Sequence, residues 1–309
     1  MKNKLTKKIK DRIFICCMLI IPVGHFLLFW CRINLGAIAL AFEDSLTGEW
    51  GFANFERFFR NFALDWNSGS GLRIALENTF ISVGIRMLIS TPLIVFVSYL
   101  LFKRFWGHMI FRIGFYIPAI VGVVITVTMR TYILDATGPI VKLGTALGIK
   151  WPYEVLQRGL IGNMLTARPT YFIQGVLCGI AGGTILLLTG IYQRIPRDLF
   201  DSMKMDGVGM FREFIHLIVP CSWSTIGIQW IMTFAAVWGD SSGVMMLTGG
   251  NYNTNNIAYY LFKSQLSAVS GTGSFNYPAA MGILLTLIVA PLTLLLRKLA
   301  NKIVEPVEF

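Results

Sequence analysis

Four residues of one apolar segment share a helix face, because Gln229, Thr233, Ala236 and Asp240 recur at i, i+4, i+7 and i+11. Polar side chains at membrane depth tend to face the interior of a helix bundle or a water-filled cavity. The functional interpretation is that Gln229, Thr233 and Asp240 line a pathway for a polar solute, with Trp238 as a stacking platform near its outer mouth. The structural alternative is that Gln229 and Thr233 only hydrogen-bond a neighbouring helix.

Arg86 places a charge inside another apolar segment, seven residues after Thr79 and therefore about 10 Å along a helix at 1.5 Å per residue. A buried arginine is costly unless it is paired or hydrated, so we expect an acid or a carbonyl group beside it. Asp240 is a candidate partner by depth, as is an acid on a partner chain. The more specific hypothesis is that Arg86 contacts an anionic substrate such as a uronate or a sugar phosphate.

The sequence contains no arrangement typical of catalysis or of a metal site. His25, His108 and His216 are scattered without metal-ligand spacing, and the five cysteines include no CxxC pair. No GxxxxGK[S/T] loop occurs, so the chain lacks this phosphate cradle for ATP. We therefore expect no catalytic residue, no metal and no cofactor bound by this chain. If ATP drives the protein, another subunit must carry the nucleotide.

A short amphipathic segment lies between two long apolar segments. It places Leu199, Phe200 and Met203 on one side of a predicted helix, and Asp206-Gly207 supplies a stop signal. A membrane protein has little reason to expose such an apolar face to water unless a soluble partner binds it. A helix seated in a groove of that partner is the expected form of contact.

This segment resembles the coupling loop of ATP-binding-cassette (ABC) importer permeases, which has the pattern E-A-A-x3-G-x9-I-x-L-P. The same spacing is occupied here by Asp201-Ser202-Met203, Gly207, Leu217, Val219 and Pro220. The departures keep charge sign, apolar character or small size, except that Met203 is larger than alanine. The resemblance implies that the residues in contact with an ATPase are Leu199, Phe200, Asp201, Met203, Asp206 and Gly207.

A second stretch is similar to the L-T-G-G-P…T…Y-Y segment of the carbohydrate-uptake branch of these permeases. It reads Leu247-Thr248-Gly249-Gly250, then Thr254 and Tyr259-Tyr260, with Asn251 where the family usually has proline. The chain thus resembles the first-type permease of the maltose and glycerol-phosphate importers. The resemblance implies a non-enzymatic subunit that forms part of the pathway for a sugar or oligosaccharide. It also implies three kinds of partner: a second, non-identical permease, two ATPase subunits that carry ATP and Mg²⁺, and an extracytoplasmic sugar-binding protein.

The elements that must position these residues are long apolar segments. The chain has 309 residues, 55% of them hydrophobic and only 14% charged, which is typical of membrane proteins. We expect an all-α membrane protein with six transmembrane helices and a cytoplasmic coupling helix. The six apolar segments of membrane-crossing length lie near 13–31, 79–102, 110–130, 171–192, 219–239 and 278–298.

Charge at the ends of these segments predicts their orientation. The first twelve residues hold six basic side chains and one acid, whereas residues 41–78 hold six acids and three arginines. Because basic residues accumulate on the cytoplasmic side of a membrane, both termini and the 193–218 loop are expected in the cytoplasm. The membrane itself is expected to be the inner membrane. The net charge of +11 then reflects contact with lipid rather than nucleic acid. The predicted organisation is an N-terminal segment, first helix and external loop (1–70), a permease core (71–300) and a cytoplasmic tail (301–309).

An ion-coupled secondary transporter of a polar solute is the alternative from another class. Such carriers usually contain internal repeats and several acids within the membrane. This sequence has no convincing repeat and no acid at the centre of a predicted span. These features favour the ABC permease.

Overall fold

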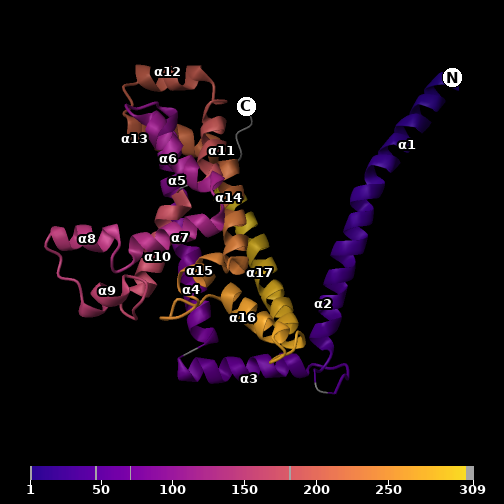
Figure 1. The fold of residues 1–309 in the computed structure, drawn as a ribbon. Coiled ribbons are helices and arrows are strands. Elements are labelled where there is room, and N and C mark those ends of the chain that lie inside the picture. The colour runs from indigo at the N-terminus through magenta and orange to yellow at the C-terminus, as the bar shows by residue number, and fades with distance from the viewer. Residues whose placement is uncertain (1, 46, 70, 181, 304–309) are drawn as a thin grey trace. The chain divides into compact units, whose positions relative to one another are not determined.

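The computed structural model describes residues 2–45, 47–69, 71–180 and 182–303. Within these ranges every regular element is a helix, and extended backbone pairs only in an isolated bridge between Glu43 and Trp50. The expected all-α fold is confirmed (Figure 1). The chain divides into two compact units: one comprises residues up to Ala63 with Ser264–Thr286, and the other comprises Leu64–Lys263 with the segment from Leu287 onward.

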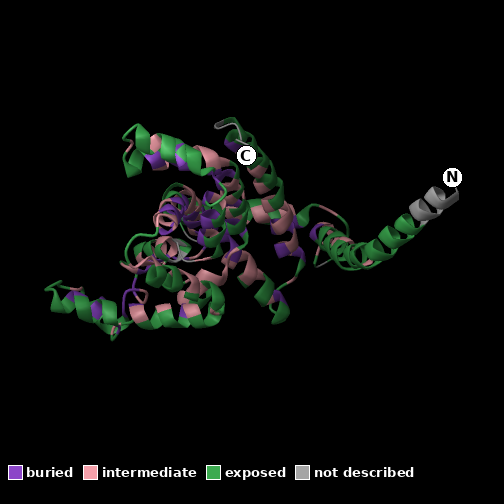
Figure 2. Cartoon of the chain, turned by 90° about the horizontal axis from the view of Figure 1, so that it is seen from above, coloured by how far each residue is buried: buried purple, intermediate pink, exposed green. Residues whose placement is uncertain are grey.

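The first unit begins with three helical elements that continue into one another: α1 (Lys2–His25), the π-helical η1 (Phe26–Cys31) and α2 (Arg32–Phe42). Together they contain an apolar helix of 33 residues, Lys10–Phe42, which includes the expected span at 13–31. None of its most apolar window is buried, and Figure 2 shows the described part of this helix as exposed along most of its length. Such a helix needs lipid or a protein partner around it.

The turn after α2 is held by an asparagine. Asn54, near the start of α3 (Ala53–Ser68), donates through Nδ2 to the carbonyl oxygens of Ala41 and Glu43 over 3.0 and 2.9 Å. Asn276 donates to the same Glu43 oxygen over 2.7 Å. Because Asn276 begins α17 (Asn276–Ile303), this contact ties the start of the last helix to the turn.

The second unit contains two continuous helices of membrane-crossing length. The first, Leu72–Phe102, has 31 residues, and the second, Met210–Gly239, has 30. They hold the expected spans at 79–102 and 219–239, but each begins seven or more residues earlier. Their elements are α4 (Leu72–Ile85), η2 (Arg86–Ser90), α5 (Thr91–Phe102), α13 (Met210–Glu213), η3 (Phe214–Ile218) and α14 (Val219–Gly239).

Each of these two helices has a π-helical turn that ends two residues before a proline, Pro92 in one and Pro220 in the other. A proline lacks an N–H and its ring clashes with the carbonyl four residues earlier in a regular α-helix. The wider π-helical turn accommodates the ring, and such turns are frequent at functional sites. In the first helix, Thr91 Oγ1 also donates to the Arg86 carbonyl oxygen over 2.9 Å.

The segment expected as a third span at 110–130 does not form one straight helix. α6 (His108–Ile120) and the following Val123–Ala146, which contains α7 (Val123–Leu134) and α8 (Pro139–Ala146), are bent by 114°. Pro118 removes an N–H from the last turn of α6, and Gly122 stands at the break. The bend turns α7 away from the direction of α6.

The segment expected as a fourth span at 171–192 is divided into α10 (Ala167–Ile180) and α11 (Gly183–Tyr192). These helices have 14 and 10 residues, whereas a span needs about 20. With α17, which holds the expected 278–298 span, the described residues contain four continuous helices of membrane-crossing length, or five if the bent pair is one span. The expected number of six is therefore not confirmed.

The main core of the second unit lies between α5, α11, η3 and α14, and it includes one residue of the short helix α12 (Arg197–Met205). Figure 2 shows the buried residues gathered within the group of helices. The largest fully buried side chains of this core are Tyr99, Tyr192, Ile185, Leu188 and Ile218. A smaller cluster under α8 and α9 (Tyr153–Arg158) consists of Leu134, Val141, Val155 and Leu160.

Candidate functional site

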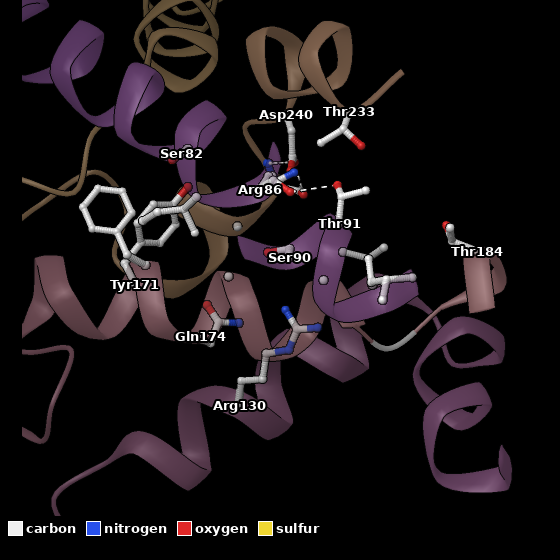
Figure 3. A pocket seen from close by; sticks show the side chains of 18 of the residues that line it. Ser82, Arg86, Ser90, Thr91, Arg130, Tyr171, Gln174, Thr184, Thr233 and Asp240 are labelled. Carbon is white, nitrogen blue, oxygen red and sulfur yellow. Dashed lines mark hydrogen bonds and ion pairs between the residues drawn. The ribbon is translucent and has the colours of Figure 1, made fainter. Parts of the chain in front are cut away.

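A polar cavity of about 300 Å³ lies in the second unit, among α4, η2, α5, α7, α10, α11 and α14 (Figure 3). Arg86 lines it from a position 14 residues after the start of its 31-residue helix, and Gln229 lines it from a position 10 residues before the end of the other long helix. The cavity therefore opens at the middle of two helices that are otherwise apolar. Its other polar lining residues include Ser82, Ser90, Thr91, Tyr171, Gln174 and Thr184.

Interruptions of regular helix surround this cavity. The π-helical η2 contributes Arg86 and Ser90, Val123 follows the break after α6, and Thr184 follows the break at Gly182. Irregular backbone at membrane depth is tolerated only where it is buried in protein or lines a water-filled space. The positions of the breaks therefore indicate that the cavity is a built feature of the bundle.

Arg86 and Asp240 form an ion pair in the cavity wall. Arg86 Nη2 lies 3.1 Å from Asp240 Oδ2, and each side chain is 32% exposed. Asp240 Oδ1 also accepts hydrogen bonds from the hydroxyl of Ser242 over 2.6 Å and from its N–H over 3.2 Å. Asp240 follows directly after α14. Burial raises the pKa of its carboxyl group, but the hydrogen bonds from Ser242 and the charge of Arg86 lower this pKa by more. The pKa of Asp240 therefore lies below its ordinary value. The carboxylate is thus ionised and balances Arg86.

This geometry matches the expected pairing of Arg86 with Asp240, although Arg86 lies about 21 Å rather than about 10 Å from the start of its helix, because the helix begins at Leu72 rather than Thr79. The hypothesis that Arg86 itself contacts an anionic substrate is not tested by this pairing. An arginine whose charge is already balanced offers less attraction to an anion than an unpaired one.

Gln229 and Thr233 lie together on the cavity side of α14, as their spacing predicts. Gln229 Nε2 donates to Thr233 Oγ1 over 3.4 Å, at the long end of the range for hydrogen bonds. The pair lines the cavity with Asp240, so the structure brings these three sequence-predicted residues to one wall (Figure 3 labels Thr233 and Asp240).

Trp238 is in a different place from the one expected, and its interpretation as a stacking platform at the pathway is corrected. Its side chain is 7% exposed and packs edge-on against Phe80, with ring centroids 5.4 Å apart. It does not line the cavity. At 3.6 residues per turn, Trp238 falls half a turn around the helix from Gln229, so helix geometry places it on the side that faces α4.

Arg130 is a cavity residue whose position the sequence did not reveal. It is the last residue of the expected third span at 110–130, and the bend between α6 and α7 brings it to the cavity wall. Figure 3 shows its side chain extending from α7 toward the space also faced by Ser90 and Gln174. Tyr171, Gln174 and Thr184 were also missed, because α10 and α11 read as one apolar segment without a polar stripe.

The predicted coupling segment forms α12, a nine-residue helix that follows Pro196. Phe200 is only 8% exposed and packs against Phe102 of α5, with ring centroids 5.6 Å apart, and Met203 packs against the same core. The expectation that Phe200 and Met203 form a free docking face is therefore wrong: their apolar side attaches α12 to its own bundle. Leu199, at 37%, and Met205, at 89%, are the more exposed apolar side chains of this helix.

The end of α12 is a glycine-dependent stop. The N–H of Val208 donates to the Met203 carbonyl over 3.0 Å, and the N–H of Gly207 donates to that of Lys204 over 3.0 Å. These two bonds form a Schellman motif, which requires a left-handed residue. Gly207 supplies it at φ +68°, as predicted for the stop, while Asp201 and Asp206 remain exposed.

A buried ionic cluster beside α12 was not predicted. Lys103 Nζ lies 2.6 Å from Glu213 Oε1, and the hydroxyl of Tyr99 donates to the same carboxylate over 3.2 Å. Lys103 Nζ also lies 5.5 Å from the ring centroid of Phe200. One lysine therefore connects the end of α5 to both α12 and α13.

No group of three or more His, Cys, Asp or Glu side chains that could hold a metal ion occurs in the part of the chain that the structure describes.

Residues 161–306 match the family described as the binding-protein-dependent transport system inner membrane component. The chain is 24% identical over 321 residues to the polygalacturonan/rhamnogalacturonan transport system permease protein YteP of Bacillus subtilis (strain 168), and the alignment covers 98% of this chain and 92% of that protein.

Two solved structures share the fold. One is a bacterial ABC transporter involved in the import of the acidic polysaccharide alginate, with a TM-score of 0.77, 18% identity, and 97% of this chain and 99% of that chain covered. The other is a bacterial alginate ABC transporter in complex with an alginate pentasaccharide-bound periplasmic protein, with a TM-score of 0.79, 18% identity, and 98% and 99% covered. The all-helical fold of this chain is therefore shared with ABC importer chains.

Proposed function

We propose that this chain, whose residues 161–306 match the inner membrane components of binding-protein-dependent transport systems, is the permease subunit of an ABC importer and forms part of the transmembrane pathway for a sugar or oligosaccharide. The observation that carries this proposal is the polar cavity at the middle of two long apolar helices. Hydroxyl and amide groups such as those of Thr233, Gln229 and Thr184 suit the hydroxyls of a sugar. The family is a transport component, so this chain is a pathway subunit and not an enzyme.

An ATPase subunit acts on this chain through α12. Phe200 and Lys103 attach the helix to α5, which continues through η2 to Arg86 in the cavity wall. The exposed side of α12, with Leu199, Asp201 and Met205, is the surface for an ATPase subunit. ATP and Mg²⁺ are bound by that partner. A displacement of α12 is therefore transmitted to the cavity along one helix.

The assembly contains a second permease, two ATPase subunits and an extracytoplasmic sugar-binding protein. The length and apolar character of Lys10–Phe42 support a membrane-embedded assembly. The alginate importer solved with an oligosaccharide-loaded periplasmic protein supports delivery of substrate by a binding protein. A heterodimer of two permeases is the arrangement that the resemblance to maltose importers favours.

The chain is a multi-pass protein of the inner membrane. Its basic N-terminal segment supports a cytoplasmic N-terminus, and the same charge rule places the C-terminus and the 193–218 loop in the cytoplasm. With this orientation α12 lies on the side where ATP is available. Residues 71–300 form the permease core, residues 1–70 its N-terminal extension and residues 301–309 the cytoplasmic tail.

The test is copurification of the tagged chain from its native membrane, followed by mass spectrometry. We expect a second multi-span permease, an ATPase subunit and a sugar-binding protein at fixed ratios. In the same experiment, a Met205→Asp variant of the tagged chain should still copurify with the second permease but not with the ATPase subunit. Recovery of the chain alone as a stable homo-oligomer would contradict the proposal and favour an ion-coupled carrier.

A further inference from the structure

The charges that line the cavity do not balance. Its charged lining residues are Arg86, Arg130 and Asp240, which leaves one positive charge in excess. Arg86 is matched by Asp240 at 3.1 Å. Within the described residues, Arg130 makes neither an ion pair nor a hydrogen bond, although its side chain is only partly exposed. A guanidinium at membrane depth without a partner is costly unless water or an anion compensates it.

A second group in the same wall also lacks a partner. Ser90 lines the cavity, is 3% exposed, and its hydroxyl has no hydrogen-bond partner in the part of the chain that the structure describes. Figure 3 shows Arg130 and Ser90 on opposite sides of one space. Unsatisfied buried polar groups are rare, and one explanation for them is a ligand that completes their bonding.

The geometry points to Arg130 as the residue of this pathway that binds the carboxylate of an acidic sugar, such as a uronate oligosaccharide. The inference rests on the proposed function, because it names the substrate class of the same cavity. A guanidinium presents a planar fork that matches a carboxylate through two parallel hydrogen bonds. Thr184, Gln229 and Thr233 then meet the hydroxyls of the sugar ring.

The size of the charge excess favours a carboxylate over a phosphate. Each ring of a uronate oligosaccharide carries one negative charge, so the one ring in contact with Arg130 matches its single uncompensated charge. A phosphate monoester carries about −1.5 to −2 at neutral pH. In this cavity a phosphate would leave an uncompensated negative charge near Asp240, because Arg86 is already paired with Asp240. The Arg86–Asp240 pair thus supports the wall, and Arg130 provides the selectivity for an anion.

The experiment measures substrate-stimulated ATP hydrolysis by the complete importer in proteoliposomes with its binding protein. The probes are galacturonate oligosaccharides, their neutral methyl esters and neutral α-glucan oligosaccharides. The wild-type assembly should respond to the acidic probe at lower concentration than to the methyl ester. Arg130→Gln should reduce this preference by about tenfold or more, because it removes hydrogen bonds between charged groups. Arg130→Lys keeps the charge without the fork, so it should retain part of the preference.

The control variant is Arg112→Gln, at an exposed position of α6 outside the cavity, which should keep the wild-type preference. Stimulation by the neutral probes alone, or equal responses of wild type and Arg130→Gln, would overturn the role of Arg130 and leave the sugar importer intact. Failure of every probe to stimulate the wild-type assembly would overturn the proposed function. If Arg130→Gln does not assemble, the acid preference of wild type and Arg130→Lys decides the question.

Discussion

Gly207 ends the coupling helix in a conformation that other residues adopt only with strain. Its φ is +68°, yet a Cβ added there would meet no atom within 4 Å. The penalty for a side chain is therefore one of backbone conformation alone, about 1–2 kcal/mol, and it is largest for a β-branched residue. A substitution at Gly207 therefore tests the backbone conformation of the turn without changing side-chain packing.

Gly207→Val should leave membrane insertion intact and lower ATP-driven uptake by about tenfold at matched expression, because the turn that orients α12 is disfavoured by that amount. The measurement is uptake of the importer's substrate into cells. Gly209→Val is the matched control, since Gly209 has a φ of −71° and equally open surroundings. Equal uptake by the two variants would show that the left-handed turn is not needed for coupling.

The Arg86–Asp240 pair should stabilise the bundle as a unit. Asp240→Asn and Arg86→Gln should each destabilise the protein by about 1–3 kcal/mol, less than a fully buried pair because both side chains are 32% exposed. The double variant should lose less than the sum of the two. Thermal unfolding of the purified assembly measures this, and Lys204→Gln, in a pair with 64% and 66% exposed side chains, should be near wild type. Strict additivity of the two changes would contradict the pairing.

At the scale of residues, the sequence predicted those cavity-lining positions that follow from helical spacing. Gln229 and Thr233 share a wall because they lie on one face of a helix that is continuous in the structure, and Asp240 joins them from the position directly after that helix. The same arithmetic would have excluded Trp238, which lies half a turn away. Arg130 was beyond such reasoning, since its position depends on a bend of 114° that spacing alone does not encode.

At the scale of elements, α12 is an integral part of the bundle with one exposed side. Phe200 and Met203 pack inward, whereas Met205 is 89% exposed. An amphipathic pattern identifies an apolar side but does not say whether the chain itself or a partner covers it. The sequence therefore predicted the existence and the end of α12 but assigned its inner side to the wrong partner.

Phe200→Ala should destabilise the protein by about 3–5 kcal/mol, the usual cost of emptying a buried aromatic site. Met205→Ala should leave stability within about 0.5 kcal/mol of wild type, as surface changes do, and weaken retention of the ATPase subunit. Thermal unfolding and copurification distinguish the two effects. The reverse result, with a stable Phe200→Ala and a strongly destabilised Met205→Ala, would mean that α12 has the opposite side buried.

The long helices were predictable because apolar length is a direct property of the sequence. Leu72–Phe102 and Met210–Gly239 contain the expected spans but begin earlier, since their first turns carry polar residues that hydropathy excludes. The breaks at Gly122 and Gly182 were not predicted. Proline and glycine are also accommodated inside continuous helices here, as Pro92 and Pro220 are by π-helical turns.

At the scale of the whole molecule, the proposed function makes the chain a part of a larger assembly. The helix Lys10–Phe42 is apolar and long enough to cross a membrane, and residues 161–306 match the inner membrane components of binding-protein-dependent transport systems. The polar cavity and α12 are connected through the helix that holds Arg86 and Phe102. Nucleotide binding at an ATPase subunit should therefore alter the accessibility of the cavity.

The most direct test is the rate at which a membrane-impermeant maleimide modifies a cysteine placed at Gln229, after replacement of the five native cysteines. The assembly is compared in membrane vesicles without nucleotide and after trapping with ATP and vanadate. A cysteine at Ile288, 53% exposed on α17 and outside the cavity, is the control and should react slowly in both states. The rate at position 229 should change several-fold on trapping. A cysteine at position 229 that reacts at the same rate in both states, or that does not react in either state, would contradict a pathway driven through α12.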